Sequence, residues 1–334
     1  MLLNALIKDE QINNDKLYSS GSYWSYKNKK TIIELKKKGL ENFRGLNSGV
    51  GSSFADNLVS DVRNELNFRG RLVGKLFSLP FLNKIFKYQV KITENYIEKF
   101  IKNLSINYKT NKEVIKLIEK YKFNNTTNFG CIRKFSYQNK EYSTLYLEMA
   151  HRIDTLSTKY NFKNIRSFFE IGGGFGANVH FLISNFPNIK KIIYLDAVPN
   201  IYVGTEYLRS HFKQNVKDYL DLRDLDKISF SDNNELEIIC IPPWLIEKLN
   251  LKVDHFHNAA SFVEMPEFVV KNYIKFIEKF KTREISLISY DNYDTNTTFN
   301  PSKLKSFFDT ELKVSWKDGL IKDYEKKLIY ITSN

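Results

Sequence analysis

The spacing of hydrophobic residues divides this chain of 334 residues into two regions with different patterns. Between about residues 28 and 120, apolar positions recur at helical intervals, as in residues 29–43 and 111–123. Gly39 is expected to end the first of these helices. The apolar and basic segment 70–91, which Pro80 interrupts, suits either a helix at a membrane surface or packing against a second domain. We therefore predict a mainly α-helical N-terminal domain, residues 1–125, that ends in a connecting loop at 121–130.

From about residue 165, short apolar runs alternate with amphipathic segments, a pattern typical of strands that alternate with helices. Because helices separate the strands, the sheet should be mainly parallel and covered on both faces. The last two strands have no helix between them and should form a closing antiparallel hairpin. The pattern predicts a seven-stranded Rossmann-like α/β domain, residues 126–334, with strands at 165–171, 190–197, 236–242, 253–260, 284–290, 312–316 and 326–332 and helices at 176–186, 200–212, 244–249, 267–280 and 301–308.

Composition narrows the class of protein. An apolar content of 42% and an aromatic content of 15% are typical of a folded protein with a full core. The sequence has no apolar stretch of the roughly 18 residues that a membrane helix needs, and residues 1–11 become charged too early for a signal peptide, so we expect a cytoplasmic protein. Cys131 and Cys240 are far apart and histidines are few, so we expect buried thiols and no metal site.

The net charge of +13 is concentrated in the first half of the chain. Residues 1–150 contain 26 Lys and Arg against 14 Asp and Glu, a balance of +12, whereas residues 151–334 contain 25 against 24, a balance of +1. Such a field favours anionic partners, among them nucleotide sugars, acidic glycans, nucleic acid or a membrane surface. The alternative is that these lysines are solvated helix faces in a chain whose composition is rich in Lys throughout.

A glycine-rich turn marks the candidate ligand site. The stretch FFEIGGGFGANVHF, residues 168–181, lies between the first expected strand of the sheet and the helix that follows it. Gly172, Gly174 and Gly176 would allow a tight turn that presents backbone N–H groups and a helix N-terminus to a ligand. Asp196, twenty residues beyond Gly176 at the end of the second strand, could accept the two hydroxyls of a ribose. The order of strand, turn, helix and acid predicts a nucleotide-type site.

The glycine pattern alone leaves the nucleotide open. It fits the dinucleotide fingerprint GxGxxA through Gly172, Gly174 and Ala177, and it also fits ExGxGxG through Glu170, Gly172, Gly174 and Gly176. Three features favour S-adenosylmethionine: the Glu170 carboxylate, which suits a methionine ammonium group, the closing hairpin, and a helical region that precedes the nucleotide fold. An NAD(P)-dependent oxidoreductase and a basic nucleic-acid-binding protein remain the alternatives.

Three segments resemble the sugar O-methyltransferase family of class I methyltransferases: residues 168–200, the strand IICIPPW and the segment HNAASFVEMPEF. That family has an ExGGG[FY]G turn, an acidic strand end followed by a proline, and an NxxSFxEM segment, which here comprises Asn258, Ser261, Phe262, Glu264 and Met265. The similarity covers roughly residues 125–290. It implies an S-adenosylmethionine-dependent O-methyltransferase that acts on a sugar or glycan hydroxyl, on an acceptor that could be anionic or nucleotide-linked. HNAASF is neither an NPPY-like nor a cysteine-bearing motif, which disfavours a nucleic-acid acceptor. A homodimer is compatible with the sequence.

Candidate catalytic residues follow the fourth strand of the sheet. A sugar hydroxyl needs a general base, and His257 and Glu264 lie at and just beyond this strand end, beside the glycine turn. The alternatives are a packed histidine and a carboxylate that stabilises the next helix N-terminus. The aromatic residues of segment 20–30, including Trp24, are expected to pack in a domain interface or, second, to cover the acceptor. We predict that the cofactor contacts Glu170, Gly172, Gly173, Gly174, Gly176, Asp196, Ala197 and Asn258.

Overall fold

The computed structural model describes residues 1–45, 99, 102–103, 105–290, 299–321 and 327–333. Its centre is a mixed sheet of eight strands in the order β5-β6-β4-β3-β7-β8-β10-β9. The pairs from β5 to β8 are all parallel, and β10 is antiparallel to both β8 and β9. The strands are β3 (Ser167–Ile171), β4 (Lys191–Leu195), β5 (Val216–Lys217), β6 (Glu237–Ile241), β7 (His255–Ala259), β8 (Glu284–Tyr290), β9 (Leu312–Lys317) and β10 (Leu328–Ser333).

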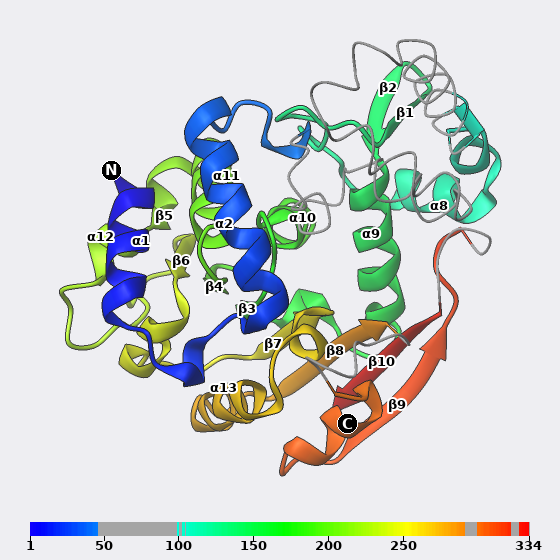
Figure 1. The fold of residues 1–334 in the computed structure, drawn as a ribbon. Coiled ribbons are helices and arrows are strands. Elements are labelled where there is room, and N and C mark those ends of the chain that lie inside the picture. The colour runs from blue at the N-terminus through cyan, green and yellow to red at the C-terminus, as the bar shows by residue number, and fades with distance from the viewer. Residues whose placement is uncertain (46–98, 100–101, 104, 291–298, 322–326, 334) are drawn as a thin grey trace, which may run out of the picture.

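Helices cover both faces of this sheet, as Figure 1 shows. Helices α10 and α11 follow β3 and β4 on one side, and α13 connects β7 to β8 on the other. The central strands are buried along nearly their whole length, as expected where both faces are covered. The helical elements of this part are η3 (Phe162–Asn164), α10 (Ala177–Asn185), α11 (Asn200–Phe212), η4 (Lys213–Asn215), α12 (Tyr219–Leu222), η5 (Pro243–Lys248), η6 (Ser261–Glu264), α13 (Glu267–Lys279) and η7 (Pro301–Phe307).

The seven predicted strands are all present, and their mainly parallel arrangement and the closing antiparallel hairpin are confirmed. The sheet has one strand more than predicted, because the two-residue strand β5 extends one of its edges. The segments predicted as helices at 244–249 and 301–308 form the 3₁₀ helices η5 and η7. Each begins with a proline, and 3₁₀ geometry is common in such short segments. A separate hairpin, β1 (Lys134–Tyr137) and β2 (Lys140–Ser143), was not predicted.

The described part of the N-terminal region is helical, as predicted. It contains α1 (Leu2–Ile12), η1 (Lys16–Tyr18), α2 (Gly21–Lys38), η2 (Phe43–Gly45) and α8 (Lys112–Lys120), and α9 (Thr144–Ser157) follows the hairpin. Gly39 ends α2 with a φ of 72°. Residues 70–91 lie outside the described residues, and the division at residue 125 stays a prediction. None of the helices in the described part of the chain combines the length and the apolar character of a membrane span.

Arg44 attaches the N-terminal helices to the sheet domain. Its side chain is 1% exposed and donates hydrogen bonds to the carbonyl oxygen of Thr126 at 2.6 Å and to Oγ of Ser143 at 2.9 Å. The guanidinium also lies 5.1 Å from the ring centre of Phe175, in the glycine turn. A buried charge of this kind requires such partners, so Arg44 fixes the position of the helices beside the turn.

Tight packing beneath the glycine turn leads to a stability prediction. A Cβ at Gly204, in α11, would lie 2.1 Å from the hydroxyl oxygen of Tyr194, which itself donates a 2.5 Å hydrogen bond to the carbonyl oxygen of Gly174. Alanine favours a helix by about 1 kcal/mol over glycine, but overpacking against a buried ring costs about 1–3 kcal/mol. We expect Gly204→Ala to lower the free energy of unfolding by about 1–2 kcal/mol in urea titrations. Gly45→Ala is the control because its Cβ would lie no closer than 3.4 Å to a neighbour; equal stability of the two variants would contradict this packing.

Candidate active site

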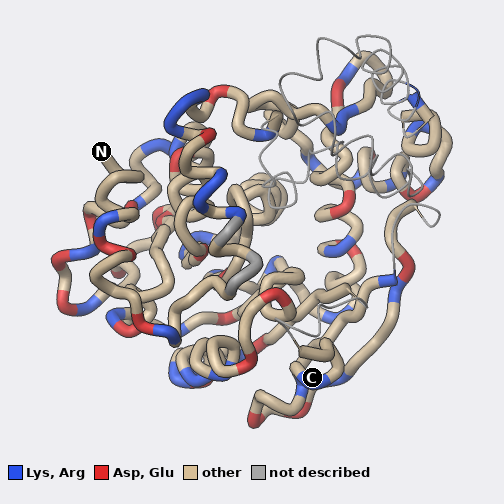
Figure 2. The backbone as a smooth tube through the Cα atoms, viewed as in Figure 1, with Lys and Arg blue, Asp and Glu red and all other residues tan. Residues whose placement is uncertain are grey.

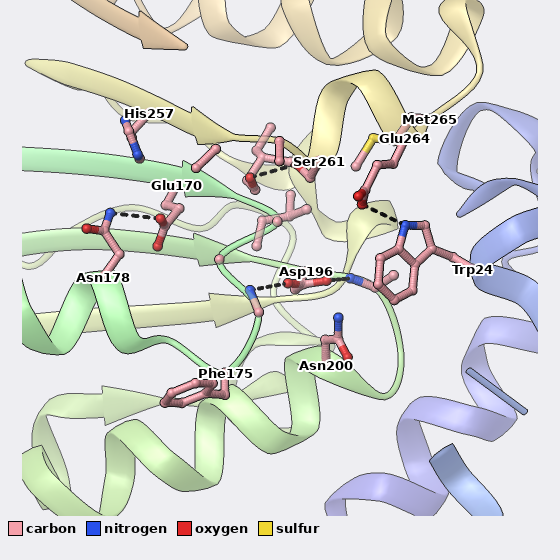
Figure 3. Close-up of a pocket in the computed structure, with 18 of the residues that line it drawn as sticks. Trp24, Glu170, Phe175, Asn178, Asp196, Asn200, His257, Ser261, Glu264 and Met265 are labelled. Atoms are coloured by element: carbon pink, nitrogen blue, oxygen red, sulfur yellow. Dashed lines mark hydrogen bonds between the residues drawn. The ribbon is translucent and has the colours of Figure 1, made fainter. Parts of the chain in front are cut away.

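A cavity of about 210 Å³ opens at the carboxyl ends of β3, β4 and β7 (Figure 3). This volume is several times the roughly 30 Å³ that one water molecule occupies in the liquid. In the sheet, β3 lies between β4, the next strand of this sheet along the chain, and β7, which comes later in the sequence. The strand order therefore reverses beside β3, and the cavity lies at this point. Open parallel sheets bind their ligands at this point.

The glycine turn forms the floor of the cavity. Gly172, Gly174 and Gly176 have φ values of 76°, 65° and 81°, a conformation that favours glycine. A Cβ on Gly172 would lie 2.2 Å from Oγ of Ser261, and one on Gly173 would lie 2.4 Å from Oε2 of Glu170. The glycines are therefore required by neighbouring side chains of this protein as well as by backbone conformation.

Glu170 is the last but one residue of β3 and lines the cavity with a buried carboxyl group. It is 2% exposed, and its Oε1 accepts a 2.8 Å hydrogen bond from Nδ2 of Asn178. Its Oε2 has no hydrogen-bond partner among the residues that the structure describes. Burial raises the pKa of Glu170 to about 7, against the opposing hydrogen bond from Asn178. A cation in the cavity would restore the ionised form.

Asp196 follows β4 and contacts the glycine turn directly. Its Oδ2 accepts a hydrogen bond from the backbone N–H of Gly174 at 2.8 Å, and its Oδ1 accepts one from the N–H of Ala197 at 2.7 Å (Figure 3). Burial raises the pKa of Asp196 to about 7, although both hydrogen bonds oppose the shift. Each carboxylate oxygen has a second lone pair, so Asp196 can accept ligand hydroxyls while it fixes the turn.

Asn258 joins the end of β7 to the end of β3. Its Nδ2 donates to the carbonyl oxygen of Ile171 at 2.8 Å and to Oγ of Ser261 at 2.5 Å, and its Oδ1 accepts from the N–H of Phe262 at 3.2 Å. Ser261 lines the cavity, whereas Asn258 and Gly176 are not among the lining residues. Direct cofactor contacts by these two residues stay predictions.

His257 lines the cavity from β7 and is 3% exposed. Its Nδ1 lies 2.8 Å from Oγ of Ser286, which also lies 2.7 Å from Nε2 of His255. Burial, with smaller contributions from His255 and Arg152, lowers the pKa of His257 to about 3. The ring is therefore neutral at ordinary pH and is a very weak base.

Glu264, in η6, lies at the opposite end of the cavity from His257 (Figure 3). Its Oε2 accepts a 2.9 Å hydrogen bond from Nε1 of Trp24 in α2. Burial raises the pKa of Glu264 to about 6, while Trp24 and the charge of Lys27 oppose the shift. Glu264 is thus ionised at neutral pH and is a stronger base than His257. The structure brings Trp24 to the site, where it belongs both to an interface and to the cavity wall.

One face of α9 forms a wall of the cavity that the sequence analysis did not find. The spacing of Leu145, Met149 and Ile153, with Glu148 and Arg152 between them, is the signal that could have revealed it. In the described lining, the acidic residues are Glu148, Glu170, Asp196 and Glu264, whereas Arg152 is the basic one.

Positive charge gathers elsewhere, along α2, as Figure 2 shows. This helix contains Lys27, Lys29, Lys30, Lys36, Lys37 and Lys38.

Within the described ranges, no group of three His, Cys, Asp or Glu side chains is arranged to hold a metal ion. Cys131 and Cys240 are both buried thiols, as predicted.

The buried carboxyl group of Glu170 should make the ligand-free protein less stable as pH rises. Because its pKa is raised to about 7 from 4.5, the folded state holds more protons than the unfolded state between these values, and the free energy of unfolding falls across that window. We expect Glu170→Gln to stabilise the ligand-free protein by about 1–3 kcal/mol at pH 8 and by little at pH 4. Urea titrations at both values measure this difference; destabilisation at pH 8 would contradict the burial of an uncompensated charge.

No protein-family model and no curated protein matches this sequence. Among solved structures, the chain is similar to magnesium protoporphyrin IX methyltransferase from Synechocystis PCC 6803 with bound SAM, at 8% identity and a TM-score of 0.38 over 57% of this chain and 80% of that chain. It is also similar to an O-methyltransferase family protein from Burkholderia thailandensis, at 9% identity and 0.38 over 57% of each chain. The O-methyltransferase from Bacillus cereus in complex with SAH gives 11% and 0.36 over 55% of this chain and 81% of that one.

Such low identities and scores assign no activity to this chain. The strand order, the antiparallel closing hairpin and the glycine turn after β3 nevertheless define the class of fold: a Rossmann-like α/β sheet of the class I methyltransferase type.

Proposed function

We propose that this protein is an S-adenosylmethionine-dependent O-methyltransferase that methylates a hydroxyl of a sugar or sugar-containing acceptor. The observation that carries the proposal is the buried, half-satisfied carboxyl group of Glu170 beside a glycine turn that Asp196 holds in place. A ligand with a positive charge at the turn and a ribose beyond it satisfies both carboxylates. Binding of such a ligand is favourable because its positive charge stabilises the ionised carboxylate and so lowers the pKa that burial has raised.

The residues present fit this cofactor. Oε2 of Glu170 is available for the methionine ammonium group, the turn at Gly172–Gly174 allows close approach, and Asp196 can accept the ribose hydroxyls. Ala197 lines the cavity next to Asp196 and contributes a backbone wall. When bound, S-adenosylmethionine supplies an activated methyl group. The protein's part is to hold the acceptor oxygen in line with that group and to exclude competing water.

The same carboxylate disfavours the NAD(P)-dependent oxidoreductase that the GxGxxA pattern left open. A dinucleotide would bring its negatively charged diphosphate to the glycine turn, beside the buried carboxyl group of Glu170, which lies against Gly173. The ionised carboxylate and a diphosphate in the same buried site carry like charges and repel each other. Protonation of Glu170 would remove the repulsion only at a cost in binding at neutral pH and above.

Glu264 is the better of the two predicted bases. Its pKa of about 6 keeps it ionised at neutral pH, whereas His257, with a pKa of about 3, has little affinity for a proton. In our proposal Glu264 takes the proton of the acceptor hydroxyl as that oxygen becomes the nucleophile. His257 instead forms part of the cavity wall, and its hydrogen bond to Ser286 holds the ring in place there.

The sugar acceptor is supported by the resemblance of residues 257–268 to the sugar O-methyltransferase family and by the mixed lining of the cavity. Tyr290 and Trp24 offer aromatic faces, and Asn28 and Glu148 offer hydrogen-bonding groups of the kind that sugar hydroxyls need. Arg152 would suit one carboxylate or phosphate on the acceptor. A role in surface glycan or glycoconjugate synthesis, a cytoplasmic location and a homodimer remain predictions.

Transfer of a radioactive methyl group from S-adenosylmethionine to a panel of free sugars, nucleotide sugars and glycans tests the acceptor class. Label on a sugar hydroxyl is expected. If the protein binds S-adenosylhomocysteine but labels only a phenol, an amine or nucleic acid, the sugar acceptor is wrong while the methyltransferase remains.

A further inference from the structure

Trp24 and Glu264 are 240 residues apart in the sequence and meet at the cavity (Figure 3). The indole Nε1 donates to Oε2 of Glu264 at 2.9 Å. The start of α2 also packs against the residues that follow Glu264, because a Cβ on Gly21 would lie 3.3 Å from Cδ of Pro266. Helix α2 therefore reaches the candidate base through a side-chain hydrogen bond and through the backbone next to it.

We propose that Trp24 is a positioning residue: it holds one oxygen of the Glu264 carboxylate and leaves the other for the acceptor hydroxyl. This inference rests on the proposed function, in which Glu264 is the base. Trp24 thereby gains a specific role, in which an N-terminal helix completes a catalytic group of the sheet domain.

The chemistry of the indole suits this role. An indole N–H is a donor only, so it binds the ionised carboxylate without accepting or supplying a proton in the reaction. A hydrogen bond to the charged form favours that form, which keeps Glu264 ready to act as a base despite its burial. Fixing Oε2 also limits rotation of the carboxylate, and catalysis depends steeply on such orientation.

Two other charged groups act on Glu264 from neighbouring elements. Lys27, in α2, favours its ionised form, and the Lys27 ammonium group lies 5.2 Å from the ring centre of Trp24. Asp196, after β4, carries a like charge, and Glu264 raises the pKa of Asp196. A pH titration of the site therefore has to separate Glu264 from Asp196 by substitution.

The first test needs neither cofactor nor acceptor. The chain has three tryptophans, Trp24, Trp244 and Trp316, so the emission of Trp24 is found by difference. We expect wild-type emission to change with a midpoint near pH 6, where Glu264 titrates, and the change to disappear in both Glu264→Gln and Trp24→Phe. Trp316→Phe is the matched control because Trp316 is 49% exposed on β9, and it should keep the transition. A transition that survives in Trp24→Phe would overturn the contact.

The second test separates positioning from mere packing. Trp24→Phe keeps an aromatic ring and removes the donor, so the acid limb of the kcat profile should move to higher pH by about 0.4–1 unit, the equivalent of one ordinary hydrogen bond. KM for S-adenosylmethionine should stay within about twofold, because the hydrogen bonds that hold Glu170 and Asp196 come from Asn178 and from the backbone of Gly174 and Ala197. A profile that overlays that of Trp316→Phe would overturn the inference. If the wild type transfers no methyl group, the proposed function fails, and the emission titration still decides whether Trp24 controls Glu264.

Discussion

Replacing Glu264 by glutamine is expected to lower kcat for methyl transfer by about 10²–10⁴-fold, the usual contribution of a general base. The amide keeps the size of the side chain and can still accept the hydrogen bond from Trp24, but it cannot take a proton from the acceptor. Because Glu264 acts on the acceptor and not on the cofactor, the Kd for S-adenosylhomocysteine should stay within about threefold of wild type. Initial rates at saturating acceptor and calorimetric titration measure the two quantities.

Glu267→Gln is the matched control for this substitution. Glu267 lies three residues further on, in the first turn of α13, and pairs with Lys271 at the protein surface. Its loss should change kcat by less than about twofold, since exposed ion pairs contribute little. If Glu264→Gln retains wild-type kcat, the base is another group and the roles of both Glu264 and Trp24 fall.

Replacing Asp196 by asparagine is expected to raise the Kd for S-adenosylhomocysteine by about 100-fold. A hydrogen bond to a charged group contributes about 1.5–3 kcal/mol, and 1.4 kcal/mol corresponds to a factor of ten. The variant loses the charged acceptor for ribose, and its amide N–H₂ faces the N–H of Gly174 or Ala197, which disturbs the turn as well. Calorimetric titration of the two proteins gives the ratio directly.

Asp254→Asn controls for the loss of backbone hydrogen bonds. One oxygen of Asp254 accepts hydrogen bonds from the N–H groups of Arg166 and Ser167, at 2.9 and 3.0 Å. These bonds lie at the amino ends of β3 and β7, at the opposite ends of these strands from the cavity. This variant should lose stability but bind S-adenosylhomocysteine with wild-type affinity. Equal weakening in both variants would mean that Asp196 acts through stability alone.

The sheet could be predicted because most of its strands are short apolar runs that amphipathic helices separate. The position of the site followed from the same pattern, since parallel strands place Glu170 and Asp196 together at their carboxyl ends, whatever the conformation of the loops. Strand β5 was missed because two residues have no periodicity to detect. The hairpin of β1 and β2 was also missed. Its two-residue turn, Gln138 and Asn139, has positive φ values of 47° and 59°, which are visible in the structure and not in the sequence.

Other parts of the site have no local signal at all. Trp24 and Glu264 meet only because α2 packs against the segment after β7, a tertiary contact that neither sequence stretch encodes alone. Sequence spacing likewise made His257 and Glu264 equal candidates. Burial separates them, because it lowers the pKa of a histidine and raises that of a carboxyl group.

Calorimetric titration of the wild-type protein with S-adenosylhomocysteine and, separately, with NADH tests the central claim most directly. A site built from buried carboxylates around a glycine turn should bind S-adenosylhomocysteine at one site per chain and should give no heat with NADH. Saturable binding of NADH in place of S-adenosylhomocysteine would contradict the account.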